Sequence, residues 1–597
     1  MGVLQRLQFP PRADISGLYF RSPDLPGLEQ GPSGPRLTLA DGQSVSTNTY
    51  FNAFFQQHHA AHCGPAEAVW ELSLAGGADV RLVRETCNNQ RQVLLETSFR
   101  DAAPDAPCAV PIPAAEQGRV YLEITARGSL ALHGGRVATR APESPARLAV
   151  IITSFRREAF VQSNVGKLLA DPDLVADLEI YVVDNGGTLT PEMFPDPRVR
   201  LVANPNTGGA GGFSRGMLEA LAEGTASHML IMDDDVEVPT ESVFRTLAFF
   251  RHARDRVAVS GAMFDLEKPH HLHEAGARWG WAIDVSRPQP LKILPLKHNV
   301  YMQTSCGLNA LLLDEPADYG AFWFFAFPAD MPREQGLCLP FFVVGDDIEF
   351  GLRFTRAFGG RIAPLAGVAV WHVPFYFKLD SLAPYFFHRN LLAVSAVHDA
   401  HSPLAVAGRF LFDTFKSVCM FDYLQAFKMV RGGEDFLLGP EALPDIPPES
   451  VHAQCEEFRT AHGLHQVAVL PDPAARPFDT EPPAGWWRDA LRWLTLGGHL
   501  VPSFLLRRTP ALAMTHRCGQ WRHPLGHRRV HLLHRELQSC RELTLRLRLG
   551  LALLLRAGRV ALGLARSWRE LSRRWRDAAP GFTSPGHWRR RLGREEP

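Results

Sequence analysis

Residues 1 to about 145 contain short runs in which hydrophobic and polar positions alternate. Trp70 to Leu74 and Val120 to Ala126 are such runs, and the pairs Gly76-Gly77 and Gly134-Gly135 separate them. Alternation with a period of two is typical of half-buried strands, and glycine pairs are typical of turns. This pattern predicts a β-sandwich domain over residues 1–145. Such a domain either binds carbohydrate or packs against its neighbour.

From about residue 146 the pattern changes to continuous hydrophobic runs of strand length with helical stretches between them. The runs are 148–153, 178–183, 199–202 and 228–232, and the helical stretches lie near 158–169 and 214–222. Strands that alternate with helices predict a parallel, doubly wound α/β sheet. We expect this α/β domain to cover residues 146–395.

The remaining third of the chain has helical periodicity. Residues 396–503 are predicted to form a helical domain with proline-rich interruptions, and residues 504–597 a basic amphipathic helical tail. In the tail, leucines fill one helical face and arginines recur at helical spacing on another. These arginines are Arg541, Arg548, Arg556, Arg559, Arg566, Arg569, Arg573 and Arg576.

Charge is distributed unevenly between the two ends of the chain. The 597 residues have a net charge of zero, but residues 504–597 carry 21 Arg, no Lys and 6 acidic residues. Such asymmetry indicates an anionic partner for the tail, either lipid or nucleic acid. Leucine-rich faces favour lipid, so we expect no nucleic-acid partner.

A helix over residues 536–578 is therefore predicted to lie on an anionic membrane. Trp568 and Trp575 stand where aromatic anchors at a lipid interface would be useful. The alternative is a basic helix packed on the acidic remainder of the same protein.

Cysteine usage and hydropathy indicate the cellular compartment of the protein. The 9 cysteines include no CxxC pair, which argues against a zinc site or a disulfide framework and favours a reducing compartment. The N-terminus shows no signal-peptide pattern, and no hydrophobic run approaches the roughly 18 to 20 residues of a membrane span. We expect a cytoplasmic protein that is peripheral at the inner face of the cell membrane.

The acidic triplet Asp233-Asp234-Asp235 directly follows the hydrophobic run that ends at Met232. A buried strand that ends in acids brings them to the edge of a sheet where open α/β folds bind ligands. Clustered carboxylates repel one another unless a hard cation lies between them, which predicts a Mg²⁺ or Mn²⁺ site. A solvated acidic turn is the alternative.

The segment Asn204 to Gly216 has glycines at positions 208, 209, 211 and 212 and precedes a predicted helix. Glycines let backbone approach a ligand closely, and a helix N-terminus favours anions. The motif matches neither a Walker loop nor GxGxxG, so a plain flexible loop is equally compatible with it.

Two further hydrophobic runs end in residues that could take part in catalysis or metal binding. Phe341 to Val344 is predicted to be a strand that leads to Asp346, a candidate N-cap, and to Asp347, a candidate general base. A capping role for both carboxylates is the alternative. The run before His372 is a third strand, and that histidine is either a metal ligand or a structural residue.

Together these segments resemble inverting, metal-dependent glycosyltransferases of the GT-A fold, family 2. More narrowly, they resemble the bacterial galactofuranosyltransferases that polymerise the mycobacterial galactan. The resemblance covers about residues 1–430 and implies a β-sandwich, a GT-A domain and C-terminal helices that help to form a homo-oligomer. Its marks are Thr49 to Phe54, Asn206 to Gly216, Asp233 to Asp235, Tyr319 to Pro328, Gly345 to Asp347, Trp371-His372 and His388 to Asn390.

The resemblance also implies roles for single residues. Asp233, Asp235 and His372 would hold Mg²⁺ or Mn²⁺ on the diphosphate of a UDP-sugar donor, and Asp347 would be the base. The donor side would comprise Arg157, Asp184, Asn206, Asp234 and His388, and the acceptor side His273, Trp323 and Asp346. The chain departs from the family at Arg156, where Asn is usual, and in the basic tail.

The expected function is therefore transfer of a sugar, galactofuranose, from a UDP-sugar to a hydroxyl of a glycan or lipid-linked glycan. Transfer of another sugar such as rhamnose on the same fold is one alternative. A non-catalytic carbohydrate- or membrane-binding protein on a decayed transferase scaffold is another. Such a protein would be expected to have lost at least one of Asp233, Asp235, Asp347 or His372, and all four are present.

Overall fold

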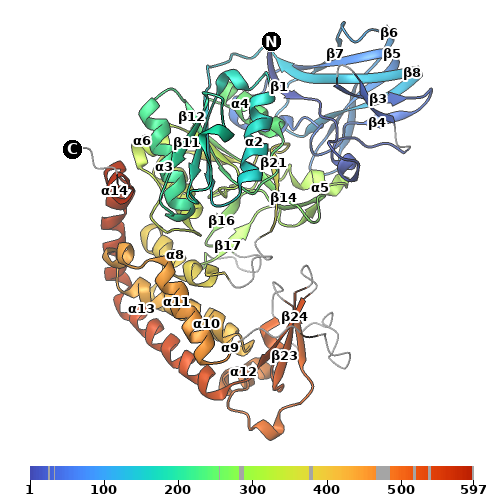
Figure 1. Cartoon of the computed structure of the whole chain (residues 1–597). Helices are drawn as coiled ribbons and strands as arrows, with labels where there is room; N and C mark the ends of the chain where they lie inside the picture. The colour runs from blue at the N-terminus through green and yellow to red at the C-terminus, as the bar shows by residue number, and fades with distance from the viewer. Residues whose placement is uncertain are drawn as a thin grey trace.

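A computed structural model describes most of the chain and divides it into three parts (Figure 1). An N-terminal β domain and a central α/β domain lie side by side, and a C-terminal group of helices with a small sheet extends below them. The described residues are 1–23, 27–31, 34–254, 256–281, 288–374, 381–464, 469, 485–514, 520–534 and 539–593.

The β domain is built around two long antiparallel strands, β5 and β8. Its eight strands form one sheet in the order β2-β3-β8-β5-β6, with β1 and β4 paired to β8 and β7 paired to β5. Hydrophobic side chains on alternate positions of β5 and β8 fill its core. The strands are β1 (Gly2–Arg6), β2 (Gly27–Gly31), β3 (Gly34–Leu39), β4 (Ser44–Ser46), β5 (Ala68–Glu85), β6 (Arg91–Ala102), β7 (Cys108–Ile112) and β8 (Arg119–Thr139), and helix α1 (Gln56–Cys63) follows β4.

The glycine pairs that were predicted to separate strands lie within them instead. Both β5 and β8 continue through their glycines, and the pairing between these strands shifts register beside Gly76 and Gly77. Gly76 has a φ of +109°, and a Cβ there would lie 2.2 Å from the carbonyl oxygen of Ser129. A bulge of this kind bends a strand without ending it, so one continuous sheet folds over the core.

The central domain contains a seven-stranded sheet in the order β11-β10-β9-β12-β19-β13-β20. Strands β9 to β12 run parallel, which confirms the predicted α/β core. Their bounds also agree with the prediction to within one or two residues. The strands are β9 (Leu148–Ser154), β10 (Leu178–Asp184), β11 (Val199–Ala203), β12 (His228–Asp233), β13 (Val257–Ser260), β19 (Phe325–Pro328) and β20 (Arg361–Ala363).

Strand β19 departs from the predicted all-parallel arrangement. It lies between β12 and β13 and is antiparallel to both. The chain enters β19 from the carboxyl edge of the sheet, where the backbone N–H of Gly261 donates to the carbonyl oxygen of Phe324. A strand that starts at that edge must run in the opposite direction to its parallel neighbours. The sheet is therefore mixed.

A second sheet extends the first at its carboxyl edge. Its order is β18-β15-β14-β21, and β14 is parallel to β21 with Asp265 opposite His372. Its strands are β14 (Ala262–Asp265), β15 (His271–Glu274), β18 (Val300–Tyr301) and β21 (Ala369–His372), and β16 (Ala277–Trp279) pairs with β17 (Ile293–Pro295).

Helices cover both faces of the central sheet (Figure 1). Hydrophobic residues of α2 and α4 pack on one face, and those of α3 and α7 pack on the other. The helices of this domain are α2 (Glu158–Ala170), α3 (Gly208–Glu223), α4 (Thr240–His252), α5 (Ser305–Ala310), α6 (Asp330–Gln335) and α7 (Asp346–Arg356).

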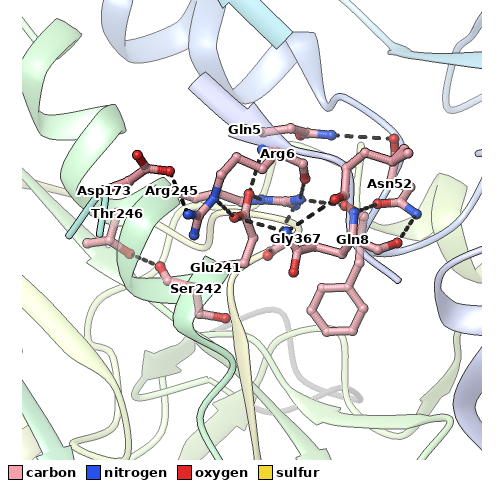
Figure 2. A network of polar contacts seen from close by, with 12 residues as sticks. Gln5, Arg6, Gln8, Asn52, Asp173, Glu241, Ser242, Arg245, Thr246 and Gly367 are labelled. Atoms are coloured by element: carbon pink, nitrogen blue, oxygen red, sulfur yellow. Dashed lines mark hydrogen bonds and ion pairs between the residues drawn. The ribbon is translucent and has the colours of Figure 1, made fainter. Parts of the chain in front are cut away.

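A buried polar network joins the β domain to the α/β domain (Figure 2). Arg6 of β1 contacts Glu241 of α4 at 2.8 Å, and Glu241 also accepts from Arg245 at 2.8 Å. Arg245 in turn donates to the carbonyl oxygen of Phe51 at 2.6 Å. Charged groups that are buried together in this way fix one relative placement, because separating them would leave a buried charge unpaired.

The C-terminal part is a layer of helices beneath the central domain. Helix α13 packs lengthwise along α8, α9 and α10. The elements are α8 (Ala383–His398), α9 (Pro403–Cys419), α10 (Tyr423–Leu437), α11 (Pro448–Ala461), α12 (Trp486–Leu494), β22 (Ala511–Met514), β23 (Arg529–His534), β24 (Ser539–Thr544), α13 (Leu547–Phe582) and α14 (Pro585–Arg591).

The long basic helix differs from its prediction in two ways. It starts at Leu547, because residues 539–544 form β24 of a small sheet with β22 and β23. Its hydrophobic face packs on the protein, since Trp568 and Trp575 are each 2% exposed and both contact Phe436. The two tryptophans are therefore core residues, and their predicted role as membrane anchors is wrong.

The end of the chain returns to the central domain. Helix α14 packs against α3, and the indole N–H of the fully buried Trp588 donates to the carbonyl oxygen of Cys338 at 2.9 Å. Helices α13 and α14 therefore connect the C-terminal helices to the central domain. Within the part of the chain that the structure describes, no helix has the length and hydrophobicity needed to cross a bilayer.

Candidate active site

Three predicted metal ligands meet at the carboxyl edge of the central sheets. Asp233 ends β12, Asp235 follows it in the next turn, and His372 ends β21. One ligand atom from each lies within 4.8 Å of the other two, and Nε2 of His372 lies 2.9 Å from Oδ1 of Asp235. Two carboxylates and an imidazole form a donor set that suits a divalent cation such as Mn²⁺ or Mg²⁺. We call Asp233, Asp235 and His372 the candidate metal group.

The middle residue of the triplet has a different neighbour. Oδ2 of Asp234 accepts the backbone N–H of Phe155 at 2.9 Å, which ties the acidic turn to the loop after β9. Burial raises the pKa of Asp234 to about 6, with smaller contributions from the charges of Asp235 and Asp233. An additional positive charge at this edge would therefore be favourable.

Arg157 supplies one such charge. Its guanidinium lies 3.9 Å from Asp235 and is half exposed, so it faces the same edge as the metal group. The neighbouring Arg156 has a φ of +59°. Asn adopts this left-handed conformation more readily than Arg, which gives a physical reason for the Asn that is usual at this position.

Asp184 and Asn206, predicted to line the nucleotide, shape the loops around this edge. The Asp184 carboxylate accepts the backbone N–H groups of Gly186, Gly187 and Leu189 at 2.9–3.0 Å. Asn206 is exposed, and its side-chain oxygen accepts the N–H of Gly208 at 3.2 Å. Asp184 therefore fixes the turn after β10, and Asn206 remains accessible beside it.

The glycine-rich segment begins a helix rather than forming the predicted loop. Helix α3 starts at Gly208, six residues before the predicted position of Ser214. A Cβ at Gly212 would lie 2.1 Å from the Thr153 side chain, and one at Gly216 would lie 2.3 Å from Ile151. The glycines therefore let the helix approach β9 closely. They also bring its N-terminus to the carboxyl edge of the sheet where Asp233, Asp235 and His372 lie, which we call the active edge.

Asp346 and Asp347 begin helix α7, but the residues before them are not a strand. Gly345 is the N-cap with a φ of +89°, and Asp346 is the first helical residue. Phe342 and Val344 also have positive φ values, +74° and +67°. Such values are incompatible with the extended strand predicted for 341–344 and indicate a loop that surrounding contacts hold in place.

Those contacts come from helix α8. The side-chain amide of Asn390 donates to the carbonyl oxygens of Val343 and Val344 at 2.9 and 2.7 Å. Arg389 donates to the carbonyl oxygen of Phe341 at 2.9 Å. Asn390 and Arg389 therefore act as positioning residues for the loop that carries Asp347.

The family comparison agrees with this geometry. A profile described as "Glycosyltransferase like family 2" matches residues 145–386, the segment that supplies every residue of the metal group and Asp347. These residues form a family 2 glycosyltransferase domain.

Two curated relatives extend the similarity beyond that domain. Galactofuranosyltransferase GlfT2 of Mycobacterium tuberculosis (strain ATCC 25618 / H37Rv) is 28% identical over 532 residues, which cover 84% of this chain and 81% of the relative. Galactofuranosyltransferase GlfT2 of Mycolicibacterium smegmatis (strain ATCC 700084 / mc(2)155) is 28% identical over 468 residues, 75% of this chain and 71% of the relative.

Among solved structures, the mannosyltransferase PcManGT from Pyrobaculum calidifontis, in complex with GDP-Man and Mn2+, is 15% identical. It covers 54% of this chain and 83% of its own, with a TM-score of 0.30.

In the glycosyltransferase, buried acids surround the candidate base. Asp347 is partly buried, and its desolvation together with the negative charge of Asp233 raises its pKa. Burial and the negative charge of Asp347 also raise the pKa of Asp346. A carboxylate such as Asp347, whose pKa is raised to about 6, is suited to accepting a proton near neutral pH.

Glu274 is a member of this acidic group that the sequence interpretation missed. It ends β15, is 8% exposed, and burial with the nearby charge of Asp347 raises its pKa to about 8. Its neighbour in sequence, His273, was noticed instead. A single carboxylate inside a short strand has no pattern that distinguishes it from an exposed one, so the sequence could not identify it.

The predicted acceptor and donor residues are spread more widely than expected. His273 is half-buried and close enough to His372 and Asp265 for their charges to affect its pKa, which burial lowers to about 4. Trp323 is 3% exposed and donates to the carbonyl oxygen of Gly261 at 2.9 Å, so it offers an acceptor little surface. His273 is therefore the better placed of the two.

His388 does not lie at the active edge. Its ring contacts Phe410 of α9, and the charges that affect its pKa all belong to α9. Nδ1 is 2.9 Å from the carbonyl oxygen of Pro384 within its own helix. The prediction of a donor-binding role for His388 is corrected, because its position between α8 and α9 makes it part of the helical core.

Proposed function

We propose that the protein transfers galactofuranose from UDP-galactofuranose to a hydroxyl of a glycan or lipid-linked glycan, with inversion at the anomeric carbon. The observation that carries the proposal is the Asp233–Asp235–His372 group with the partly buried Asp347 near Asp233. The choice of sugar is supported by the names of the two relatives that match most of the chain.

Asp233, Asp235 and His372 would hold the divalent cation, Mn²⁺ or Mg²⁺, against the donor diphosphate. A cation bound there offsets the negative charge that develops on the departing UDP. Arg157, half exposed and 3.9 Å from Asp235, adds a positive charge on the same side. The N-terminus of α3, which its glycines bring close to β9, favours the same anion.

Asp347 would accept the proton of the attacking hydroxyl. The acceptor oxygen then forms its bond to the anomeric carbon while the bond from that carbon to the UDP oxygen breaks. A single displacement of this kind inverts the configuration. The raised pKa of Asp347 makes it a stronger base than an exposed carboxylate, and His273 and Asp346 would flank the acceptor.

The outer face of α13 still supports a membrane surface as a partner of the protein. Arg559, Arg566 and Arg569 are exposed there, whereas Arg556 is paired with Glu434 at 2.8 Å. An anionic surface would place the enzyme near a lipid-linked acceptor. The homo-oligomer that the resemblance implies stays a prediction.

A donor screen tests the proposal. The purified protein is incubated with Mn²⁺, a short galactan acceptor and one of several sugar nucleotides, including UDP-galactofuranose, UDP-galactopyranose and dTDP-rhamnose, and nucleotide release is measured. We expect release with UDP-galactofuranose, dependent on acceptor and abolished by EDTA. Release with dTDP-rhamnose alone would reject the assigned sugar, and no release with any donor would reject catalysis.

A further inference from the structure

A polar groove of about 410 Å³ lies on the β domain, away from the residues of the candidate active site. Strands β4, β5 and β8 contribute to it, together with the segment before β2. The side chains that line it are mostly charged or bear a hydroxyl group, and they include Arg21, Ser44, Ser46, Arg81, Glu123 and Thr125. We call this site the β-domain groove. Its size suits a small ligand or one portion of a longer one.

Strand pairing arranges most of these side chains in two rows. In the first row Ser46 of β4 lies opposite Glu123 of β8, and Glu123 lies opposite Arg81 of β5. In the second row Ser44 lies opposite Thr125. The residues between the rows are buried in the core, because successive side chains of a strand point to opposite faces. The register of the sheet therefore fixes the polar lining of the groove.

Arg21 borders the groove where helix α5 of the α/β domain lies against the β domain (Figure 1). Its backbone forms two hydrogen bonds with that of Ser46, of 2.9 and 2.7 Å, and its Nη1 donates to Oγ of Ser305 in α5 at 3.5 Å. Its Nε and Nη2 are buried and have no hydrogen-bond partner among the described residues. Unpaired guanidinium N–H groups favour a ligand that supplies oxygen acceptors.

The chemistry of the groove fits a neutral polyhydroxyl ligand better than an anion. The serine and threonine hydroxyls can donate and accept, the arginines donate, and the Glu123 carboxylate accepts. Arg81 contacts Glu96 at 2.9 Å and remains 58% exposed, so it is accessible to a ligand. A phosphate would meet the negative charge of Glu123. Sugar hydroxyl groups, which both donate and accept, match all of these partners.

The groove is connected to the acceptor side of the active site through α5 and β18. Ser305 begins α5, and Tyr301 ends β18 four residues earlier, a distance of at most about 14 Å. Tyr301 pairs with His271 of β15, two residues before the predicted acceptor residue His273. The Tyr301 ring is 41% exposed, and its centroid lies 5.2 Å from that of His271. An exposed aromatic ring between the two sites offers an apolar surface with a polar tip.

We propose that the β-domain groove is a second carbohydrate site, which binds the part of a glycan acceptor that lies several sugars away from the reacting hydroxyl. The choice of a glycan as ligand rests on the proposed transferase function. The β domain then does more than pack against its neighbour. The buried network of Arg6, Glu241 and Arg245 holds the groove at a fixed position relative to the active edge.

Calorimetric titration of the full-length protein with galactofuranose oligosaccharides of two and of eight residues tests the proposal. No sugar nucleotide is present, so binding is measured apart from transfer. We compare the wild type with Arg81→Ala, which removes a lining donor, and with Thr125→Tyr, which fills the groove. Arg136→Ala is the matched control. Arg81 and Arg136 are 58% and 54% exposed, and each contacts a strand glutamate, at 2.9 and 2.6 Å, but Arg136 does not line the groove.

We expect the wild type to bind the octasaccharide more tightly than the disaccharide. Arg81→Ala and Thr125→Tyr should weaken octasaccharide binding by at least about fivefold, and Arg136→Ala should bind as the wild type does. Transfer to the disaccharide should be unchanged in all three variants, which separates this test from that of the transferase. Equal wild-type affinity for the two oligosaccharides, or unchanged octasaccharide affinity in Thr125→Tyr, would overturn the proposal. Displacement of the octasaccharide by inorganic phosphate would identify an anion site and overturn it as well.

Discussion

Nε2 of His372 lies 2.9 Å from Oδ1 of Asp235, although 137 residues separate them in sequence. A backbone pairing next to it explains the approach. The N–H of Glu237 donates to the carbonyl oxygen of Trp371 at 2.8 Å, and the N–H of Trp371 donates back at 3.0 Å. This bridge joins the end of β21 to the acidic turn, so backbone hydrogen bonds hold the candidate metal ligands together.

Replacing Asp235 should separate metal binding from folding. Asp235→Ala removes one candidate ligand and the contact to His372, and we expect Mn²⁺ affinity to fall by more than about 100-fold. Turnover should fall with it, while thermal unfolding stays close to wild type because Asp235 is partly exposed. Mn²⁺ titration by calorimetry and UDP release measure the two effects.

Glu237→Ala is the matched control for Asp235→Ala, because it removes a neighbouring acid and leaves the backbone bridge in place. It should keep normal metal affinity. Full activity of the wild type after dialysis against excess EDTA would contradict the metal assignment altogether.

Asp347→Asn should remove transfer but keep donor binding. An amide has nearly the same shape as the carboxylate and cannot accept the proton, which typically costs about 10² to 10⁴ in rate. UDP affinity should change little. Asp330→Asn replaces the equivalent first-turn acid of α6, which is exposed, and should have no effect. An equal loss of UDP affinity and turnover would make Asp347 a donor-site residue instead.

The strand ends of the central sheet could be predicted because hydrophobic runs have a simple physical cause. Buried strands such as β9, β10 and β12 must be hydrophobic throughout, and the polar residue that ends each run marks the edge of the sheet. Asp233 and His372 were found for this reason. Residues 341–344 form an equally hydrophobic run, yet Phe342 and Val344 adopt left-handed backbone. Their conformation depends on Asn390, about fifty residues away.

The tail shows a second limit. Helical spacing of Leu and Arg predicts correctly that one face of α13 is buried, but the same pattern serves lipid and protein equally well. The structure decides between them because Phe436 covers Trp568 and Trp575. The burial of Trp588 could not be predicted, because a single tryptophan among arginines does not indicate that its helix packs against α3.

Asn390→Ala should test the support of the Asp347 loop. Removing the amide leaves buried carbonyl groups unpaired, which costs about 1–3 kcal/mol in the free energy of unfolding. A small shift of Asp347 should also lower turnover by about 10²-fold. Ser395→Ala, also buried on α8 but bonded to Asp399, should leave turnover normal. Chemical denaturation and initial rates measure both quantities, and unchanged turnover in Asn390→Ala would reject the positioning role.

Trp588→Ala should show that the C-terminal helix is part of the fold. Truncation of a fully buried tryptophan typically costs about 3–5 kcal/mol. A Cβ on Gly211 would lie 3.3 Å from the Trp588 ring, so loosening it should also weaken UDP binding at the start of α3. Trp486→Ala, which removes an exposed ring, should leave both quantities unchanged. Equal stability of the two variants would mean that α14 does not support the glycosyltransferase domain.

Glu274 should make stability depend on pH. Its pKa is raised from 4.5 to about 8, mainly by burial, so between those values the folded protein keeps a proton that the unfolded chain releases. A folded state that binds more protons than the unfolded state loses stability as pH rises. The favourable contribution of Glu274 to the free energy of unfolding is complete below pH 4.5 and lost by about pH 8. The Glu274→Gln variant lacks this pH-dependent contribution.

The stability of Glu274→Gln relative to wild type should therefore increase from pH 5 to pH 8, by up to about 1.4 kcal/mol for each pH unit. Denaturation at both pH values, wild type beside variant, measures the difference and cancels the contribution of every other group. Glu315→Gln, a half-exposed carboxylate, is the control and should show no such trend. A constant difference between wild type and Glu274→Gln would mean that Glu274 is ionised in the folded protein, and that the acidic group around Asp347 carries one more negative charge.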